Sequence, residues 1–243
     1  MSRTRLIFLG LLVVVVVVGV VVSTSGAEPQ VGTCKSVEKN PSYCIGGVAL
    51  ESAEGAGGTS GSAILRATIA GTTAEVKCAT GKSSGFIEGF AAGAVGKTKT
   101  KITFETCKLL APEHCKLTSA EETKIKTTEL IGELELTGGK RLDKLEPKAG
   151  AAFATIGIEG GSLCGIGEIE KPEAFNITGS QLCEVDSSKA EAETEAEKHK
   201  LICKASGSGN LGIGTNPAEI EDETMAVELS GAKAHGHWSV KET

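Results

Sequence analysis

Eight cysteines constrain the fold of this 243-residue chain more than any other feature of its sequence. They all lie after an apolar N-terminal segment, at Cys34, Cys44, Cys78, Cys107, Cys115, Cys164, Cys183 and Cys203. An even number of cysteines in an exported chain predicts disulfide bonds. The sequence contains no C-x-x-C pair, and this weakens the alternative of a zinc site. The chain is therefore expected to be crosslinked by disulfides at these positions.

The pairing of eight cysteines cannot be fixed from sequence alone. Short separation along the chain favours Cys34 with Cys44, Cys107 with Cys115 and Cys183 with Cys203, which leaves Cys78 for Cys164. That last bond would close the longest loop, and crosslinking a longer loop removes more chain entropy from the unfolded state. It is therefore expected to contribute most to stability.

The N-terminus has the pattern of a secretory signal peptide. Arg3 and Arg5 precede an apolar run over residues 6–22, and the small residues 25–27 offer a cleavage point before Glu28. The alternative is an uncleaved anchor, because the run has the minimum length that spans a bilayer. Residues 1–27 are expected to be the signal peptide, and the mature protein is expected to be secreted or in the cell envelope. A membrane is a partner only if this segment is retained.

Charge and composition narrow the remaining possibilities. The formal net charge is −6, which disfavours binding to nucleic acid or to anionic lipid. Aromatic residues make up only 3% of the chain, so the core is expected to consist of Val, Ile, Leu and Ala. Such side chains bury less area than Phe or Trp, which makes covalent crosslinks useful. No sequence feature indicates a cofactor, and the partner is unknown.

Alternating polar and apolar residues predict strands along most of the chain. Residues 99–106 alternate Lys, Thr and Glu with Ile102 and Phe104. Residues 63–69 and 73–79 form a candidate hairpin around Gly71, and residues 124–137 turn at Gly138 into 141–146. Further extended segments are expected at residues 151–158, 167–170, 174–178, 200–204, 210–213, 219–229 and 236–240.

These signals predict an all-β fold, an antiparallel sandwich or barrel-like domain over residues 63–243. It is expected as one domain or as two subdomains, 63–164 and 165–243. Residues 28–62 are interpreted as loop-like, with a flexible Gly-rich linker at 54–61. Residues 84–95 are interpreted as strand and turn. Residues 188–199 have helix-forming composition but a period of two, and the period favours a strand.

Several short motifs resemble a group of exported proteins from soil actinobacteria. They are Thr106-Cys107-Lys108 with Cys115, the Gly turn after residues 129–137, and Phe153 leading to Cys164. His199 to Cys203, Asn210-Leu211-Gly212 and Trp238 extend the likeness to the C-terminal part. The resemblance implies a secreted, disulfide-bonded β protein, supports the pairing of Cys183 with Cys203, and implies no activity.

Two motifs suggest chemistry. Gly81-Lys82-Ser83-Ser84-Gly85 matches G-x-S-x-G, in which Ser83 would be a hydrolase nucleophile, but only within a strand–turn–helix of an α/β sheet. His235 and His237 would share one face of a strand and could both reach a metal ion, although a third ligand is needed. Neither motif is complete. The favoured function is therefore a non-enzymatic structural or binding protein outside the cell, with a metal-binding module or a secreted hydrolase as the alternatives.

Overall fold

The computed structural model describes an all-β protein. The described residues are 42–45, 48–50, 52–88, 95–118, 123–138, 140–166, 173–185, 199–203, 210–221, 223–229 and 238–241. Every regular element among them is a β-strand, and neighbouring strands pair antiparallel. The prediction of an antiparallel, barrel-like fold crosslinked by disulfides is confirmed. None of the described residues forms a helix long and apolar enough to cross a membrane.

Some of the predictions concern residues outside these ranges. They are the signal peptide or anchor at 1–27, the strand at 167–170, residues 188–198, and the pair His235 and His237. The bond between Cys34 and Cys44 also stays a prediction, because Cys34 lies outside the described residues.

One nine-stranded sheet contains a ring of eight strands, called the barrel below. β6 pairs with β7 on one side and with β3 on the other, and these two pairings close the ring of strands. In ring order the strands are β7 (Lys97–Glu105), β11 (Leu130–Thr137), β12 (Lys140–Pro147), β15 (Gln181–Val185), β16 (His199–Cys203), β19 (Glu223–Leu229), β3 (Glu54–Ser60) and β6 (Thr80–Glu88). The ninth strand, β10 (Ile125–Lys126), pairs with the end of β7.

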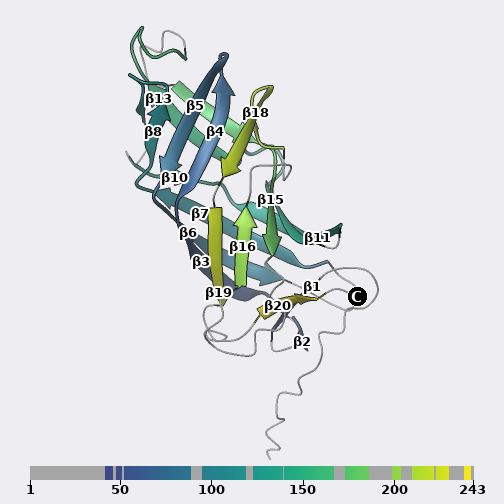
Figure 1. The fold of residues 1–243 in the computed structure, drawn as a ribbon. Coiled ribbons are helices and arrows are strands. Elements are labelled where there is room, and N and C mark those ends of the chain that lie inside the picture. The colour runs from purple at the N-terminus through teal and green to yellow at the C-terminus, as the bar shows by residue number, and fades with distance from the viewer. Residues whose placement is uncertain are drawn as a thin grey trace, which may run out of the picture. The chain divides into compact units, whose positions relative to one another are not determined.

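The second sheet has eight strands and forms a half-barrel. Figure 1 shows β5 and β4 side by side, with β18 next to β4. The strand order is β8 (Lys108–Ala111), β5 (Thr72–Cys78), β4 (Ala63–Ile69), β18 (Asn216–Glu221), β17 (Gly212–Ile213), β14 (Glu173–Thr178), β13 (Ala154–Glu159) and β9 (Lys116–Leu117).

A small third sheet consists of β2 (Val48–Ala49), β1 (Ser42–Ile45) and β20 (Trp238–Lys241). β1 is its central strand and pairs with β20 over four residues. This pairing brings the two ends of the described chain together.

The chain passes repeatedly between the barrel and the half-barrel. β3 is followed directly by β4, β5 by β6, and β7 by β8, and each step leaves one sheet for the other. The predicted extended segment 219–229 likewise divides into β18 in the half-barrel and β19 in the barrel. Each sheet therefore draws on both halves of the sequence, and a division into 63–164 and 165–243 does not separate them.

Both predicted hairpins are confirmed. β4 and β5 pair from Ala63 with Cys78 to Ile69 with Thr72, around Gly71 at a φ of 81°. β11 and β12 pair up to Thr137 with Lys140, and Gly138 in the turn has a φ of 60°. A glycine suits these two positions because positive φ is costly for side chains with a Cβ.

The interpretation of residues 28–62 as loop-like, with a flexible linker at 54–61, is wrong for the described part of this segment, which contains β1, β2 and β3. Residues 54–60 form β3, which pairs with β19 on one side and with β6 on the other. Glycine weakens a strand locally, but hydrogen bonding on both edges and burial of Ala56 and Ser60 hold this one in place. Tertiary pairing has overridden the local preference.

The pairing of Cys183 with Cys203 is confirmed. The two residues are directly opposite each other on β15 and β16, and their Cα atoms are 4.2 Å apart. Both side chains are buried within the barrel. The bond therefore crosslinks two neighbouring barrel strands.

The predicted bonds Cys107–Cys115 and Cys78–Cys164 are both wrong: Cys107 is bonded to Cys78 and Cys115 to Cys164. Cys78 lies where β5 continues into β6, and Cys107 lies where β7 continues into β8. β6 pairs with β7 and β5 pairs with β8. The two cysteines therefore meet at the point where both strands cross between the sheets.

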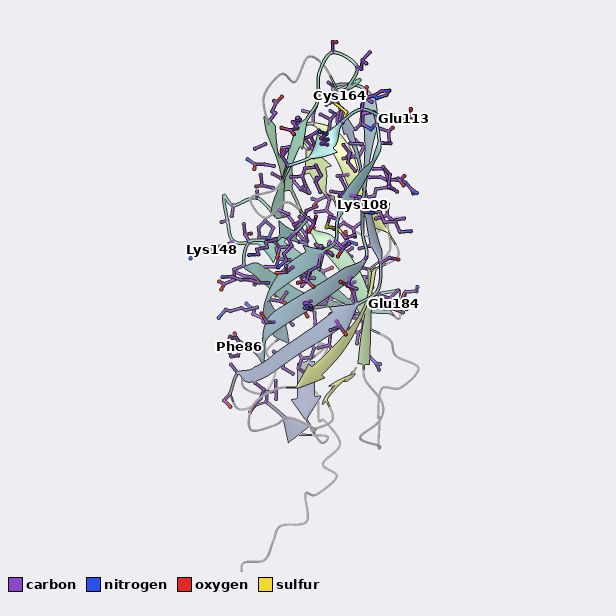
Figure 2. All side chains as sticks on the ribbon, turned by 90° about the vertical axis from the view of Figure 1, so that its left-hand side faces the viewer. Phe86, Lys108, Glu113, Lys148, Cys164 and Glu184 are labelled. Atoms are coloured by element: carbon purple, nitrogen blue, oxygen red, sulfur yellow. A yellow bond between two sulfur atoms is a disulfide. The ribbon has the colours of Figure 1, made fainter. Side chains whose placement is uncertain are left out.

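The Cys115–Cys164 bond follows from the pairing of β9 with β13. Glu159 at the end of β13 is opposite Lys116, so the next residue, Gly160, comes beside Cys115. A Cβ at Gly160 would collide with the Cβ of Cys164, so the glycine leaves room for the bond. The bond lies at the Cys164 label in Figure 2. The strand β8 carries the chain away from Cys107, which explains why the nearest cysteine in sequence is not the partner.

The described core is built mainly from aliphatic side chains, as the composition predicts. Ile156, Ile158 and Leu130 are completely buried, and most of the remaining buried residues are Ile, Leu, Val or Ala. Phe104, Phe153 and Tyr43 are the aromatic members of this core. Tyr43 has a second role in the barrel.

Candidate functional site

The interior of the barrel contains a cavity, which is called the lumen below. Six barrel strands line it: β3, β6, β7, β12, β16 and β19. Its volume is about 40 Å³. Its wall is mainly apolar, with Ile87, Ile102, Leu145 and Val227 among the lining residues.

The lumen remains open because β3 and β6 present very small residues to it. Ala56 on β3 and Ser83 and Gly85 on β6 lie along its wall. Protein interiors normally fill such space with larger side chains. In eight-stranded barrels the interior is just wide enough to be filled or to hold one small ligand. The small residues of β3 and β6 therefore help to create the cavity.

One carboxylate lies in this apolar interior. Asp143 on β12 lines the lumen and is completely buried. The Thr98 hydroxyl donates to Asp143 Oδ2 at 3.1 Å, and the Tyr43 hydroxyl donates to the same oxygen at 3.3 Å. Thr98 comes from β7 and Tyr43 from β1. The third sheet is therefore hydrogen-bonded to a barrel side chain.

Glycines make room for this cluster of Tyr43, Thr98 and Asp143. Gly132 on β11 is directly opposite Thr98, and a Cβ there would collide with Thr98 Oγ1 and Asp143 Oδ1. A Cβ at Gly96 would come within 2.8 Å of Tyr43 Cδ2 and 3.0 Å of the Tyr43 backbone nitrogen. Asp143 and Thr98 thus approach each other across β11, because Gly132 places no side chain between them.

Gly132→Ala is expected to destabilise the fold by about 1–3 kcal/mol, because the added methyl overpacks the site and displaces Thr98 or Asp143. Gly61→Ala is the matched control, since a Cβ at Gly61 has no neighbour within 4 Å, and a change within about 0.5 kcal/mol is expected there. Guanidinium denaturation of both variants measures the difference. Equal stability of the two would show that the close approach at Gly132 is absent.

Burial dominates the electrostatics of this cluster. Desolvation raises the pKa of Asp143 to about 6, although the hydrogen bonds from Thr98 and Tyr43 act in the opposite direction. Burial also raises the pKa of Tyr43 well above its usual range, and the neighbouring Asp143 adds to this shift. Desolvation is the larger effect on Asp143 because no described lysine or arginine forms an ion pair with it. Asp143 is therefore neutral in acid and ionised above about pH 6.

The hydrolase interpretation of Ser83 is not supported by its surroundings. Ser83 lies in the middle of β6, opposite Gly58 on β3 and Ile102 on β7. A nucleophile elbow requires a sharp turn between a strand and a helix, whereas residues 80–88 form one continuous strand. The match to G-x-S-x-G reflects small residues facing the lumen.

The proposed metal ligands His235 and His237 lie outside the described residues, so that hypothesis stays a prediction. Within the described residues, no three His, Cys, Asp or Glu side chains gather as metal ligands. The described His114 lies in the loop between β8 and β9, with a φ of 64°.

No pattern in the sequence distinguishes Asp143 or its partners as a site. Asp143 and Leu145 share the inward face of β12. In the alternation of this strand the charged Arg141 falls on that same face, whereas the apolar Leu142 falls on the opposite face. The pattern of this strand is therefore ambiguous. Thr98 and Tyr43 are 45 and 100 residues away from Asp143 in the sequence. No local sequence pattern therefore indicates that the three side chains meet.

Comparison with protein-family models, curated proteins and solved structures found no match to this chain. The site is therefore interpreted from its own geometry.

Proposed function

We propose that this is an exported, non-enzymatic protein with a structural or binding role in the cell envelope or outside the cell. One observation carries the proposal: each of the six cysteines in the described bonds has its partner within the chain. Disulfides of this kind persist in oxidising compartments and are rare in the cytosol. The apolar run in residues 6–22 supports the same location.

The position of the bonds supports a structural purpose. Cys78–Cys107 joins two crossings between the sheets, and Cys183–Cys203 joins two barrel strands. Cys164, Cys183 and Cys203 are almost fully buried, whereas redox-active cysteines are usually accessible. The bonds fit a role in holding a core of small side chains together.

The closed geometry of the polar cluster supports a non-enzymatic role. Asp143 and Tyr43 are 0% and 1% exposed, so a substrate of ordinary size cannot contact them in this conformation. The outer wall of the barrel carries cross-strand ion pairs such as Lys99 with Glu88 at 3.0 Å and Lys140 with Glu184 at 2.9 Å. A large partner would meet this charged outer wall.

Expression of the full chain in a secreting bacterium, beside a variant that lacks residues 2–27, tests the proposal. The full chain is expected outside the cytoplasm, beginning at Glu28, and unreactive towards a thiol reagent until it is reduced. The variant is expected to remain in the cytosol with reactive thiols, because the cytosol keeps cysteines reduced. Cytosolic full-length protein with free thiols would contradict export.

A further inference from the structure

We propose that a row of exposed lysines on the outer surface, together with Phe86, binds a linear acidic polysaccharide whose sugar residues carry carboxylates. The row lies on β5, β6, β7 and β8, on the faces of these strands that point away from the core. The inference names a partner class for the binding role proposed above, and it rests on the location outside the cytoplasm proposed there.

The strands that carry this lysine row are basic in an otherwise acidic chain. Residues 72–111 contain six lysines and three glutamates but no arginine or aspartate, so their formal charge is +3, whereas the whole chain has a formal charge of −6. Positive charge concentrated on one part of a surface attracts anions. All six lysines are exposed; they are Lys77, Lys82, Lys97, Lys99, Lys101 and Lys108.

On β7 the charges follow the direction of the strand. Lys97, Lys99 and Lys101 are exposed, whereas Thr98 and Ile102 on the opposite face of the strand are buried. Side chains two residues apart on a strand share a face and are about 7 Å apart. The lysines therefore form a line rather than a broad patch, and a linear polymer can contact several of them at once.

The row continues onto the half-barrel, where two lysines face each other. Lys108 at the start of β8 is directly opposite Lys77 on β5, and Figure 2 shows Lys108 above Phe86. Like charges directly opposite each other on paired strands are destabilising. A bound anion would remove this repulsion, so the pair is explained by an anionic partner.

The acidic side chains on these strands do not neutralise the whole row. Glu75, Glu88 and Glu105 already have ion-pair partners, at distances between 2.8 and 3.0 Å. Two of these partners belong to the row, Lys82 and Lys99. The other four lysines form no ion pair with a described residue and keep their charge available for a partner; they are Lys77, Lys97, Lys101 and Lys108.

Phe86 adds an apolar contact beside the row. Its side chain is 53% exposed, and Figure 2 shows it at the edge of the ribbon. It is directly opposite Lys99 on β7 and Gly55 on β3, and the glycine has no side chain that could cover the ring. The C–H groups of a sugar ring pack against an aromatic face, which carries partial negative charge. An acidic sugar residue can therefore contact Phe86 with its ring and a lysine with its carboxylate.

This arrangement favours a polysaccharide over other polyanions. Proteins that bind single-stranded nucleic acid stack successive bases on several aromatic side chains, whereas Phe86 is the one exposed aromatic side chain among the described residues. An anionic membrane presents a broad surface, and the acidic remainder of the chain would be repelled by it. A linear chain of acidic sugars needs only the row and one aromatic contact.

Calorimetric titration of the purified, disulfide-bonded protein with sodium polygalacturonate at low ionic strength tests the proposal. Dextran is the matched neutral polysaccharide, and polyglutamate is the matched polyanion without sugar rings. Saturable binding is expected for polygalacturonate, none for dextran, and binding several-fold weaker for polyglutamate. The binding of polygalacturonate should be lost at high salt, because salt screens exposed charges.

Three substitutions combined, Lys77→Gln, Lys101→Gln and Lys108→Gln, are expected to weaken binding of polygalacturonate about tenfold, because three exposed ion pairs of modest strength are lost. Phe86→Ala should weaken it several-fold without a change of charge. Circular dichroism checks that the variants are folded, as expected for substitutions at exposed positions.

The matched control removes the same charge from β12 and the turn after it, with Lys140→Gln, Lys144→Gln and Lys148→Gln combined, and should change the affinity less than twofold. Four results would overturn the proposal: no saturable binding of polygalacturonate, an equal loss in both triple variants, unchanged affinity in Phe86→Ala, or tighter binding to oligothymidylate or to phosphatidylserine vesicles. Because purified protein is used, a failure here would leave the export experiment unaffected.

Discussion

Asp143→Asn is expected to make the protein more stable at neutral pH, by up to about 3 kcal/mol relative to the unchanged chain. Burial raises the pKa of Asp143 from 3.8 to about 6. The folded state must therefore hold a desolvated negative charge above pH 6. An Asn side chain has nearly the same shape, and its carbonyl oxygen can accept from Thr98 and Tyr43 without that charge.

The direction of the pH dependence follows from proton binding. The pKa of Asp143 is higher in the folded state than in the unfolded chain, so the folded state binds the proton more tightly. This contribution to stability is fully present below about pH 3.8 and is lost as the pH rises through about 6. At pH 3.5 the two proteins should be about equally stable.

Guanidinium denaturation of both proteins between pH 3.5 and 8 measures this effect. The quantity to follow is the difference in the free energy of unfolding, because ionisation of the other groups cancels in it. The difference should grow in favour of Asp143→Asn between pH 4 and 7. A difference that stays constant across this range would mean that burial does not raise the pKa of Asp143.

Cys115→Ala combined with Cys164→Ala is expected to lower the free energy of unfolding by about 4 kcal/mol. This bond has the largest sequence separation of the three described, at 49 residues, so its loss releases the most chain entropy in the unfolded state. It also fixes the loop after β13 to the start of β9.

Replacement of both Cys183 and Cys203 by Ala is the comparison for this prediction. That bond spans 20 residues, so the expected loss is smaller, at about 3 kcal/mol. Urea denaturation of both double variants at one pH gives the comparison. A loss below about 1 kcal/mol in the Cys115 and Cys164 variant would contradict the assigned bond.

Local features of the fold could be predicted because they depend on neighbouring residues. The hairpins around Gly71 and Gly138 were predictable, since alternating strands flank a glycine that allows positive φ. The bond Cys183–Cys203 was predictable for a similar reason: the two cysteines lie on adjacent antiparallel strands.

The other bonds could not be predicted because they depend on how strands cross between sheets. Cys78 and Cys107 come together only when β6 pairs with β7 while β5 pairs with β8. Separation along the chain carries no information about this arrangement. The same is true of β3, whose glycines suggest a linker until the pairing with β19 and β6 is known.

The candidate site was the least predictable part. Its three side chains come from β1, β7 and β12, and the space for them comes from Gly132 on a fourth strand, β11. An aspartate in a strand with charged neighbours on both faces is usually solvated. Only closure of the barrel places Asp143 inside.

The connectivity of the disulfides tests the central claim, a barrel and a half-barrel crosslinked where the chain passes between them. Digestion of the unreduced protein should use trypsin with a glutamate-specific protease, because Lys171 precedes Pro172 and trypsin alone leaves Cys164 and Cys183 in one peptide. Mass spectrometry is expected to find 78–82 linked to 106–108, 114–116 linked to 160–168, and 174–184 linked to 201–204. A linked pair of 106–108 with 114–116 would contradict the crossing of the sheets and the fold built on it.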